Sequence, residues 1–371
     1  MDARTIRLRA GLSVLWRREG ESQIGVDPRC AVVLENLTRG EQRVLDLLDS
    51  PDFAPTEADL TRLGHTVGVA PGRVRELLGL LDRSGVLDHG SRRTGSALGP
   101  EEAYWSRVLP GGDGAGLLAG RDHAVVRVCG LDHVGLRIAT HLSEAGVGTL
   151  LLDDEHPVRR SDVGPYEPID VGRPRAERAR ALLRASYPRL RTQAEPGRGP
   201  DLMVAVFAAV ADPVRLVPVL REDLEHLPVV IGDVDIAVGP LVRPGRGPCT
   251  RCLDLHRTEA DPAWPAVATQ MRCAAPAAAA RQLGQIGAVV AAHQALAAID
   301  GREVAVEAAT LEVGPLSPLP VLRQWTIHPE CGCGGPDPVR AAGADAAAGR
   351  SRTDPHASTS EQPASRPTAP V

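Results

Sequence analysis

The chain has 371 residues, a length typical of roughly two to three domains, and 43% of its residues are apolar, enough to form real cores. Aromatic residues make up only 2%, so those cores must be built mainly from Leu, Val and Ala. A net charge of −5 gives no overall attraction to nucleic acid or to an anionic membrane. The sequence contains no lysine, which excludes any mechanism that needs a catalytic or phosphate-binding lysine.

Residues 1–93 carry the signals of a small α+β module. Three short runs of strand-forming residues come first: Leu12–Trp16, Gln23–Val26 and Ala31–Leu34. Three helix-start signals follow: Thr38-x-x-Glu41, Thr56-x-x-Asp59 and Pro71. Strands followed by three helices predict a winged-helix-like module.

The rest of the chain divides by composition into a linker, a larger domain and a tail. Residues 94–120 are rich in Gly, Ser and Pro and predict a linker, with a short helix at Glu101–Val108. Residues 121–335 alternate apolar strand runs with Ala-, Arg- and Leu-rich helices, which predicts an α/β domain with a mostly parallel sheet. Residues 336–371 have no hydrophobic periodicity, so a disordered tail is expected there.

The larger domain begins with the layout of a nucleotide-binding turn. The strand Val125–Val128 is followed by a turn from Gly130 to Gly135, a helix, a second strand and the acidic residue Asp154. The acid in such a turn normally binds a ribose hydroxyl, and the glycines let a phosphate reach the helix N-terminus. Only the outer two glycines are present, and Asp132 stands where a glycine allows close approach. Its charge would repel phosphate, so the sequence favours a scaffold over a working nucleotide site.

Two cysteine pairs predict a metal site. Cys249-x-x-Cys252 and Cys331-x-Cys333 both lie in turn-forming sequence rich in Gly or Pro. Four thiolates are the donors of a closed, structural, tetrahedral Zn²⁺ site. The sequence has no signal-peptide pattern and no apolar run of about 20 residues, so we expect a cytoplasmic protein without a membrane span. Paired cysteines there favour metal binding, and disulfides or free thiols are the alternative.

The ordered set of motifs in residues 120–335 resembles the ThiF/MoeB family of ubiquitin-activating-enzyme-like adenylyltransferases. The motifs that carry the resemblance are Gly130–Gly135, Ala145–Gly148, Asp154, Val171–Arg175 and Gly247–Cys252. The resemblance implies a Rossmann-like sheet with helices on both faces, structural zinc and a homodimer. It places the helix Gln282–Asp300 near the dimer interface. It also implies adenylation of the C-terminal Gly-Gly of a sulfur-carrier protein.

The residues that would perform this chemistry are mostly replaced. By resemblance, the nucleotide-binding residues are Gly130, Gly135, Asp154 and Arg175. The Asn and Arg that face the ATP phosphates in the family fall at Asp162 and Pro165, and the magnesium-binding aspartate falls at Ala208. Phosphoryl chemistry depends on neutralising phosphate charge. The resemblance therefore implies a vestigial nucleotide site, with ATP and Mg²⁺ not expected as cofactors and no catalytic residue.

The N-terminal module resembles PqqD-like domains, which recognise leader peptides of ribosomally made precursors. The resemblance lies in the layout and in Gln23-x-Gly25-x-Asp27. It implies that a leader peptide binds as an added strand beside a helix. The candidate peptide-binding residues are Val32, Leu34, Val74 and Leu77.

The fusion of the two parts resembles the leader-peptide-binding (ocin-ThiF-like) proteins of azoline-forming, or TOMM, peptide biosynthesis. It implies a precursor leader peptide and a YcaO-type cyclodehydratase as partners. Two alternatives stay open: an active adenylyltransferase and a winged-helix DNA-binding regulator. Residues 1–93 contain 14 Arg and 14 Asp plus Glu, and a neutral module disfavours DNA binding.

Overall fold

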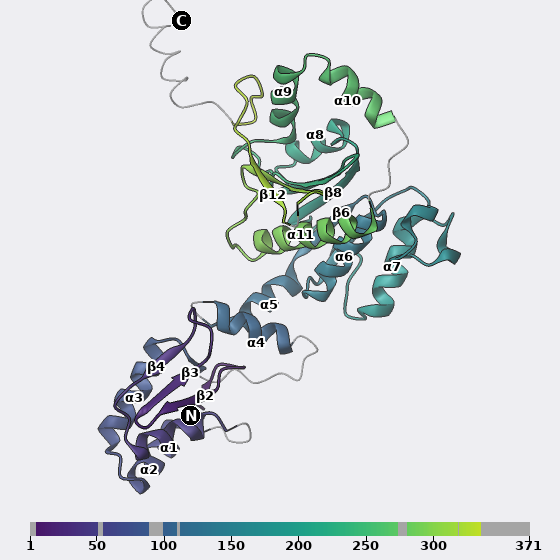
Figure 1. Cartoon of the computed structure of the whole chain (residues 1–371). Helices are drawn as coiled ribbons and strands as arrows, with labels where there is room; N and C mark the ends of the chain where they lie inside the picture. The colour runs from purple at the N-terminus through teal and green to yellow at the C-terminus, as the bar shows by residue number, and fades with distance from the viewer. Residues whose placement is uncertain are drawn as a thin grey trace, which may run out of the picture.

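The computed structural model describes residues 5–50, 55–88, 99–109, 112–273, 280–317 and 319–334. A small N-terminal module, a helical hairpin and a larger α/β domain follow one another along the chain and in space (Figure 1). The disordered tail predicted for residues 336–371 lies outside the described residues.

The N-terminal module is built from short antiparallel strands and three helices. Its strands are β1 (Arg7–Leu8), β2 (Val14–Arg18), β3 (Glu21–Ile24), β4 (Val32–Leu34) and β5 (Leu87–Asp88). Its helices are α1 (Arg39–Leu48), α2 (Glu57–Thr66) and α3 (Pro71–Arg83). One sheet has the order β2-β3-β4, and β1 pairs with β5, so the two ends of the module meet.

The helices of the module begin where the sequence predicts. Thr38 and Thr56 each accept a hydrogen bond from the backbone three residues on, in a reciprocal capping box with Glu41 and Asp59. Such a cap is worth about 1 kcal/mol. Pro71 occupies the first turn of α3, where its missing N–H costs nothing. The apolar faces of the three helices and the inner face of the sheet share one core.

One helix lies within the stretch predicted as a linker, and a second begins within it and ends just after it. They are α4 (Gly99–Val108), at the place expected for a short helix, and α5 (Gly114–His123). They pack on each other as a hairpin between the module and the α/β domain (Figure 1).

The α/β domain has one seven-stranded sheet in the order β12-β11-β10-β9-β8-β6-β7. Its strands are β6 (Val125–Cys129), β7 (Thr149–Asp153), β8 (Leu202–Ala208), β9 (His226–Ile231), β10 (Ile236–Val238), β11 (Ala309–Val313) and β12 (Val321–Gln324). Strands β7, β6, β8 and β9 are parallel, and β10 to β12 extend the sheet antiparallel. The predicted α/β class with a small N-terminal α+β module is confirmed.

Helices cover both faces of this sheet. They are α6 (His133–Glu144), α7 (Arg175–Ser186), α8 (Pro213–Arg221), α9 (Thr250–Ala260), α10 (Trp264–Cys273) and α11 (Arg281–Ile299). Helices α6 and α11 pack on one face over the main core, and α8 packs on the other face (Figure 1). No helix among the described residues is long and apolar enough to cross a membrane.

The strand order creates a crevice at a defined place. From β6 the chain moves to β7 on one side, and it then returns to β8 on the other side of β6. At such a reversal the loops after neighbouring parallel strands diverge and leave space between them. The candidate site lies at this reversal.

Candidate functional site

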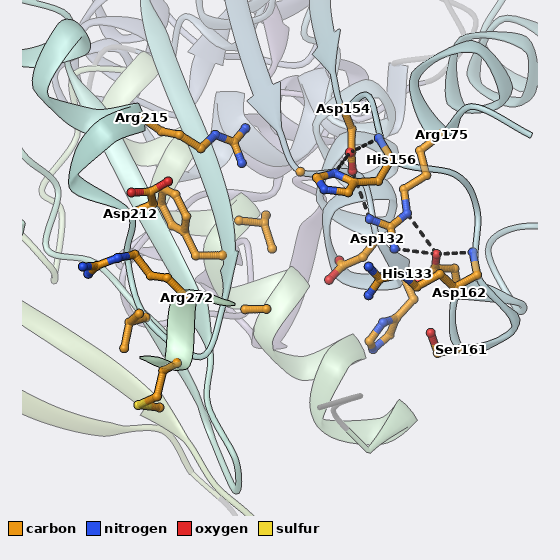
Figure 2. Close-up of a pocket in the computed structure, with 17 residues that line it drawn as sticks. Asp132, His133, Asp154, His156, Ser161, Asp162, Arg175, Asp212, Arg215 and Arg272 are labelled. Atoms are coloured by element: carbon orange, nitrogen blue, oxygen red, sulfur yellow. Dashed lines mark hydrogen bonds and ion pairs between the residues drawn. The ribbon is translucent and has the colours of Figure 1, made fainter. Parts of the chain in front are cut away.

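A cavity of about 380 Å³ lies at the carboxyl ends of β6, β7 and β8. Figure 2 shows its two walls. Asp132, Asp154, His156, Asp162 and Arg175 form one wall, and Asp212, Arg215 and Arg272 come from the opposite side. The cavity therefore contains part of the nucleotide-type turn and most of the residues that the family resemblance places around ATP: Gly130, Asp154, Asp162, Arg175 and Ala208.

The two predicted glycines allow the turn after β6 to pack closely. Gly130 has a φ of +83°, and a Cβ there would lie 2.5 Å from the carbonyl oxygen of Val206. A Cβ on Gly135 would overlap the carbonyl oxygen of Gly130. Both positions thus require glycine for the fold of the turn, whether or not a nucleotide binds there.

Asp132 occupies the N-terminus of α6 with its own side chain. Its Oδ1 accepts hydrogen bonds from the backbone N–H groups of Val134 (2.9 Å) and Gly135 (3.0 Å). These N–H groups point outward from the first turn of the helix, where they would otherwise bind an anion. Burial raises the pKa of the Asp132 carboxyl, while the same N–H groups act in the opposite direction. The helix end is therefore satisfied internally.

Asp154 is fully engaged by the protein (Figure 2). Its Oδ1 accepts from the backbone N–H (2.9 Å) and Nδ1 (2.8 Å) of His156. Its Oδ2 accepts from the backbone N–H of Leu131 (2.7 Å) and from Arg175 (3.2 Å). Burial alone would raise the pKa of Asp154, but these hydrogen bonds and Arg175 hold it below its usual value. Four donors fill the four acceptor positions of a carboxylate, so none is left for a ribose hydroxyl.

Arg175, which the resemblance aligns with a phosphate-binding lysine, is also paired within the protein. Its Nε and Nη2 donate to Oδ2 of Asp162 at 2.9 and 2.7 Å, and its Nη1 donates to Asp154. The side chains of all three residues are at most 8% exposed. One buried guanidinium between two carboxylates holds the loop after β7 against α7, and the charge of Arg175 is paired within the protein.

The opposite wall contains two polar residues, Asp212 and Arg215, that the sequence analysis did not predict as site residues. Ala208, where the resemblance places a magnesium-binding aspartate, ends β8, and Asp212 and Arg215 line the same cavity from the start of α8. Asp212 caps α8 through the N–H of Val214 at 3.0 Å. Arg215 lies over the ring of Phe207 at 5.7 Å and points into the cavity (Figure 2). The sequence signal for them is Asp-Pro at a helix start, a few residues after a buried strand.

The four predicted metal ligands meet, although the two pairs are set 79 positions apart along the chain. The Sγ atoms of Cys249 and Cys331 are 3.4 Å apart, and those of Cys252 and Cys333 are 3.3 Å apart. All four sulfur atoms lie within 4.8 Å of one another. Zn–S bonds of about 2.3 Å in a tetrahedron place sulfur atoms about 3.8 Å apart. The donor set and its spacing therefore fit one structural zinc ion.

The first turn of α9 favours thiolates in this cluster. Cys249 is the N-cap of α9 and Cys252 lies in its first turn, where the helix dipole stabilises negative charge. Burial would raise the pKa of Cys252, but hydrogen bonds from the backbone of His328 and Cys249 lower it overall. A thiolate is the form that binds metal.

A second cluster of possible ligands, His256, Glu259 and His328, lies beside the cysteines. His256 donates from Nε2 to the carbonyl of Thr326 at 3.0 Å, and Glu259 lies between His256 and His328. Nδ1 of His328 accepts from the N–H of Glu330 at 3.1 Å, so neutral His328 carries its proton on Nε2, which is 2.9 Å from Glu259.

The predicted peptide-binding residues divide between the core and the edge of the module. Leu34, Val74 and Leu77 are at most 4% exposed and belong to the module's core, and Val32 is half-buried. Within the described residues β4 is the last strand of its sheet, so its outer backbone edge is open. The apolar side chains that β4 and α3 do expose are Val33 (44%) and Leu80 (42%).

No protein-family model matches the sequence, and no curated protein matches it. Solved structures match the fold. A structure of E. coli MccB with AMPCPP and MccA has a TM-score of 0.65 and 12% identity, over 89% of this chain and 99% of that one. The microcin C7 biosynthetic enzyme MccB with N-formylated MccA has a TM-score of 0.63 and 13% identity, with the same coverage. PaaA has a TM-score of 0.61 and 13% identity, over 85% of this chain and 98% of that one. At such identities the likeness shows the fold alone, and it extends over both the module and the α/β domain.

Proposed function

We propose that this chain binds the leader peptide of a ribosomally made precursor and presents it to a YcaO-type cyclodehydratase that forms azolines. The observation that carries the proposal is the open edge of β4 in a three-stranded sheet, because such an edge takes up an extended peptide as a further strand. The structures of MccB with MccA give a protein of the same fold that binds a precursor peptide.

The α/β domain in this proposal is a scaffold held by one structural zinc ion at the four cysteines. The Asp132 carboxylate accepts hydrogen bonds from the free N–H groups at the N-terminus of α6, and Asp154 and Arg175 bind each other within the protein. The expected homodimer is supported by α11, whose exposed residues include Gln285, Ile286 and Val289 and which has no charged residue from 282 to 299. A solvated helix face is normally charged. Sedimentation of the full chain tests this assembly.

Replacing Val33 by Pro should lower the affinity for the leader peptide at least about tenfold. Proline removes the N–H of residue 33 and disturbs the extended backbone of β4, so main-chain hydrogen bonds to the peptide are lost. Each such bond is worth about 0.5–1.5 kcal/mol. The measurement is a titration of labelled leader peptide against the full chain. Trp16→Pro is the matched control, because Trp16 lies on β2 at the other edge of the sheet. The hydrogen bond from the Gly25 N–H to the Ser13 carbonyl fixes the alternation along this ladder, so the N–H of Trp16, like that of Val33, faces away from β3. Normal binding by folded Val33→Pro, or loss with Trp16→Pro alone, would contradict docking on β4.

An active adenylyltransferase is the second candidate, and Asp212 and Arg215 favour it. They bring a carboxylate and an unpaired guanidinium into the cavity near Ala208, where the resemblance places a magnesium-binding aspartate. The likeness to MccB structures that contain ATP points the same way. The two candidates differ in ATP turnover.

We expect no magnesium-dependent ATP–pyrophosphate exchange by the wild-type chain, and tighter binding of an ATP analogue by Asp132→Gly. Glycine frees the two N–H groups and the space that the carboxylate fills, at a cost of only a few tenths of a kcal/mol in capping. Asp113→Gly is the control, because Asp113 caps α5 away from the cavity. Exchange at about 1 s⁻¹ or faster would establish the enzyme and refute the scaffold.

A further inference from the structure

The contact between the N-terminal module and the α4–α5 hairpin is reciprocal. Arg9, in the module, donates from Nη1 to the carbonyl oxygens of Ser106 (3.1 Å) and Leu109 (3.3 Å) at the end of α4. Arg107, on α4, donates from Nη1 to the carbonyl oxygen of Ala10 at 2.8 Å. The module and the hairpin thus each contribute one arginine whose guanidinium donates to backbone carbonyl groups of the other.

Glycines on both sides make room for these two side chains. A Cβ at Gly11 would overlap the guanidinium of Arg107, and a Cβ at Gly112 would overlap that of Arg9. Both glycines have positive φ angles, +81° and +70°, so they shape the turns that expose the carbonyl groups. The turn at Arg9 is itself fixed to the module by a hydrogen bond from its N–H to Val86 at 2.9 Å.

The end of α4 suits a cation. The last carbonyl groups of a helix have no partners within the helix and carry the negative end of its dipole. Arg9 satisfies two carbonyl groups in that region, and the planar guanidinium makes both bonds at once. The hairpin is in turn fixed to the α/β domain by Arg121 of α5, which donates to Asp300 at 2.9 and 2.8 Å.

We propose that Arg9 and Arg107 form a clasp that fixes the orientation of the N-terminal module on the α/β domain, so that a bound peptide leaves the module in one direction. The directional part rests on the proposed peptide-binding function. The clasp itself does not, because it concerns only contacts within the chain. Arg9 and Arg107 are positioning residues in this proposal, and neither touches the peptide.

The first measurement follows tumbling of the module by NMR relaxation in the full chain. In the wild type the module should tumble with the whole protein. In Arg9→Ala/Arg107→Ala it should tumble faster, toward the rate set by its own mass, with its own resonances otherwise in place. Gly11→Ala should act in the same direction by displacing Arg107. Gly68→Ala is the matched control, because Gly68 has a φ of +82° in the same module and no atom within 4 Å of its Cβ position.

The second measurement separates the clasp from peptide binding. The affinity of the double variant for the leader peptide should stay within about twofold, since distant sites act independently. The yield of modified precursor with the partner cyclodehydratase should fall. Unchanged tumbling in the double variant would refute the clasp, and faster tumbling with an unchanged yield would refute its role in direction. If the wild type binds no leader peptide, the proposed function fails, and the tumbling data decide the clasp alone.

Discussion

Replacing Cys252 by Ser is expected to remove the bound zinc and to lower the melting temperature by on the order of 10 °C. Loss of a structural metal belongs to the changes that cost about 4 kcal/mol or more, and 1 kcal/mol corresponds to about 2–4 °C in a domain of this size. The ion would join the start of α9 to the loop after β12, so its loss releases both. Metal analysis and thermal unfolding measure the two effects together.

The control for this prediction is Cys273→Ser. Cys273 is exposed at the end of α10 and lies outside the four-cysteine cluster, so its replacement should change neither zinc content nor melting temperature. Wild-type protein that contains no zinc, or Cys252→Ser that melts like wild type, would show that the cluster is not a structural zinc site.

Replacing Asp300 by Ala is expected to destabilise the protein by about 3–5 kcal/mol, because it leaves a buried guanidinium without its main partner. The side chains of Arg121 and Asp300 are each 1% exposed. Arg121 also contacts Glu101 at 3.2 Å and the carbonyl of Ala145 at 3.0 Å, and it lies 5.1 Å from the ring of Trp105. One arginine thus joins α4, α5, the end of α6 and the end of α11.

Denaturant unfolding of three further variants would test this explanation. Arg121→Met/Asp300→Leu removes both charges and should recover part of the loss, because a buried pair can be replaced by apolar side chains at little cost. Glu19→Ala breaks the exposed pair of Glu19 with Arg39 and should leave stability unchanged. If Asp300→Ala unfolds like wild type, Arg121 does not depend on Asp300.

The contacts of Arg9, Arg107 and Arg121 form a continuous series that links the N-terminal module to the α/β domain. The clasp joins the module to α4, and Arg121 joins the α4–α5 hairpin to the α/β domain. Asp300→Ala should therefore loosen the hairpin as well as lower stability. In the relaxation experiment on the module, it should resemble the clasp variants in direction.

Local features of this protein follow from the sequence alone. Thr38 and Thr56 mark helix starts because a cap and its partner lie within one turn of each other. The strand, turn and helix around Gly130 are read in the same way, from apolar runs and glycines a few residues apart. The cysteine pairs indicate a four-sulfur site because short spacing and soft donors already restrict the geometry.

The tertiary structure decided which way side chains face and which distant residues meet. The apolar stripe of α3 could equally have lined a peptide groove, but Val74 and Leu77 face the module's core. Asp132 was expected to repel phosphate, and the fold shows that its carboxylate also consumes the N–H groups of α6. Arg121 meets Asp300 across 179 positions of sequence, which no local pattern records. Such contacts depend on how whole apolar faces pack, and packing is set by all the elements together.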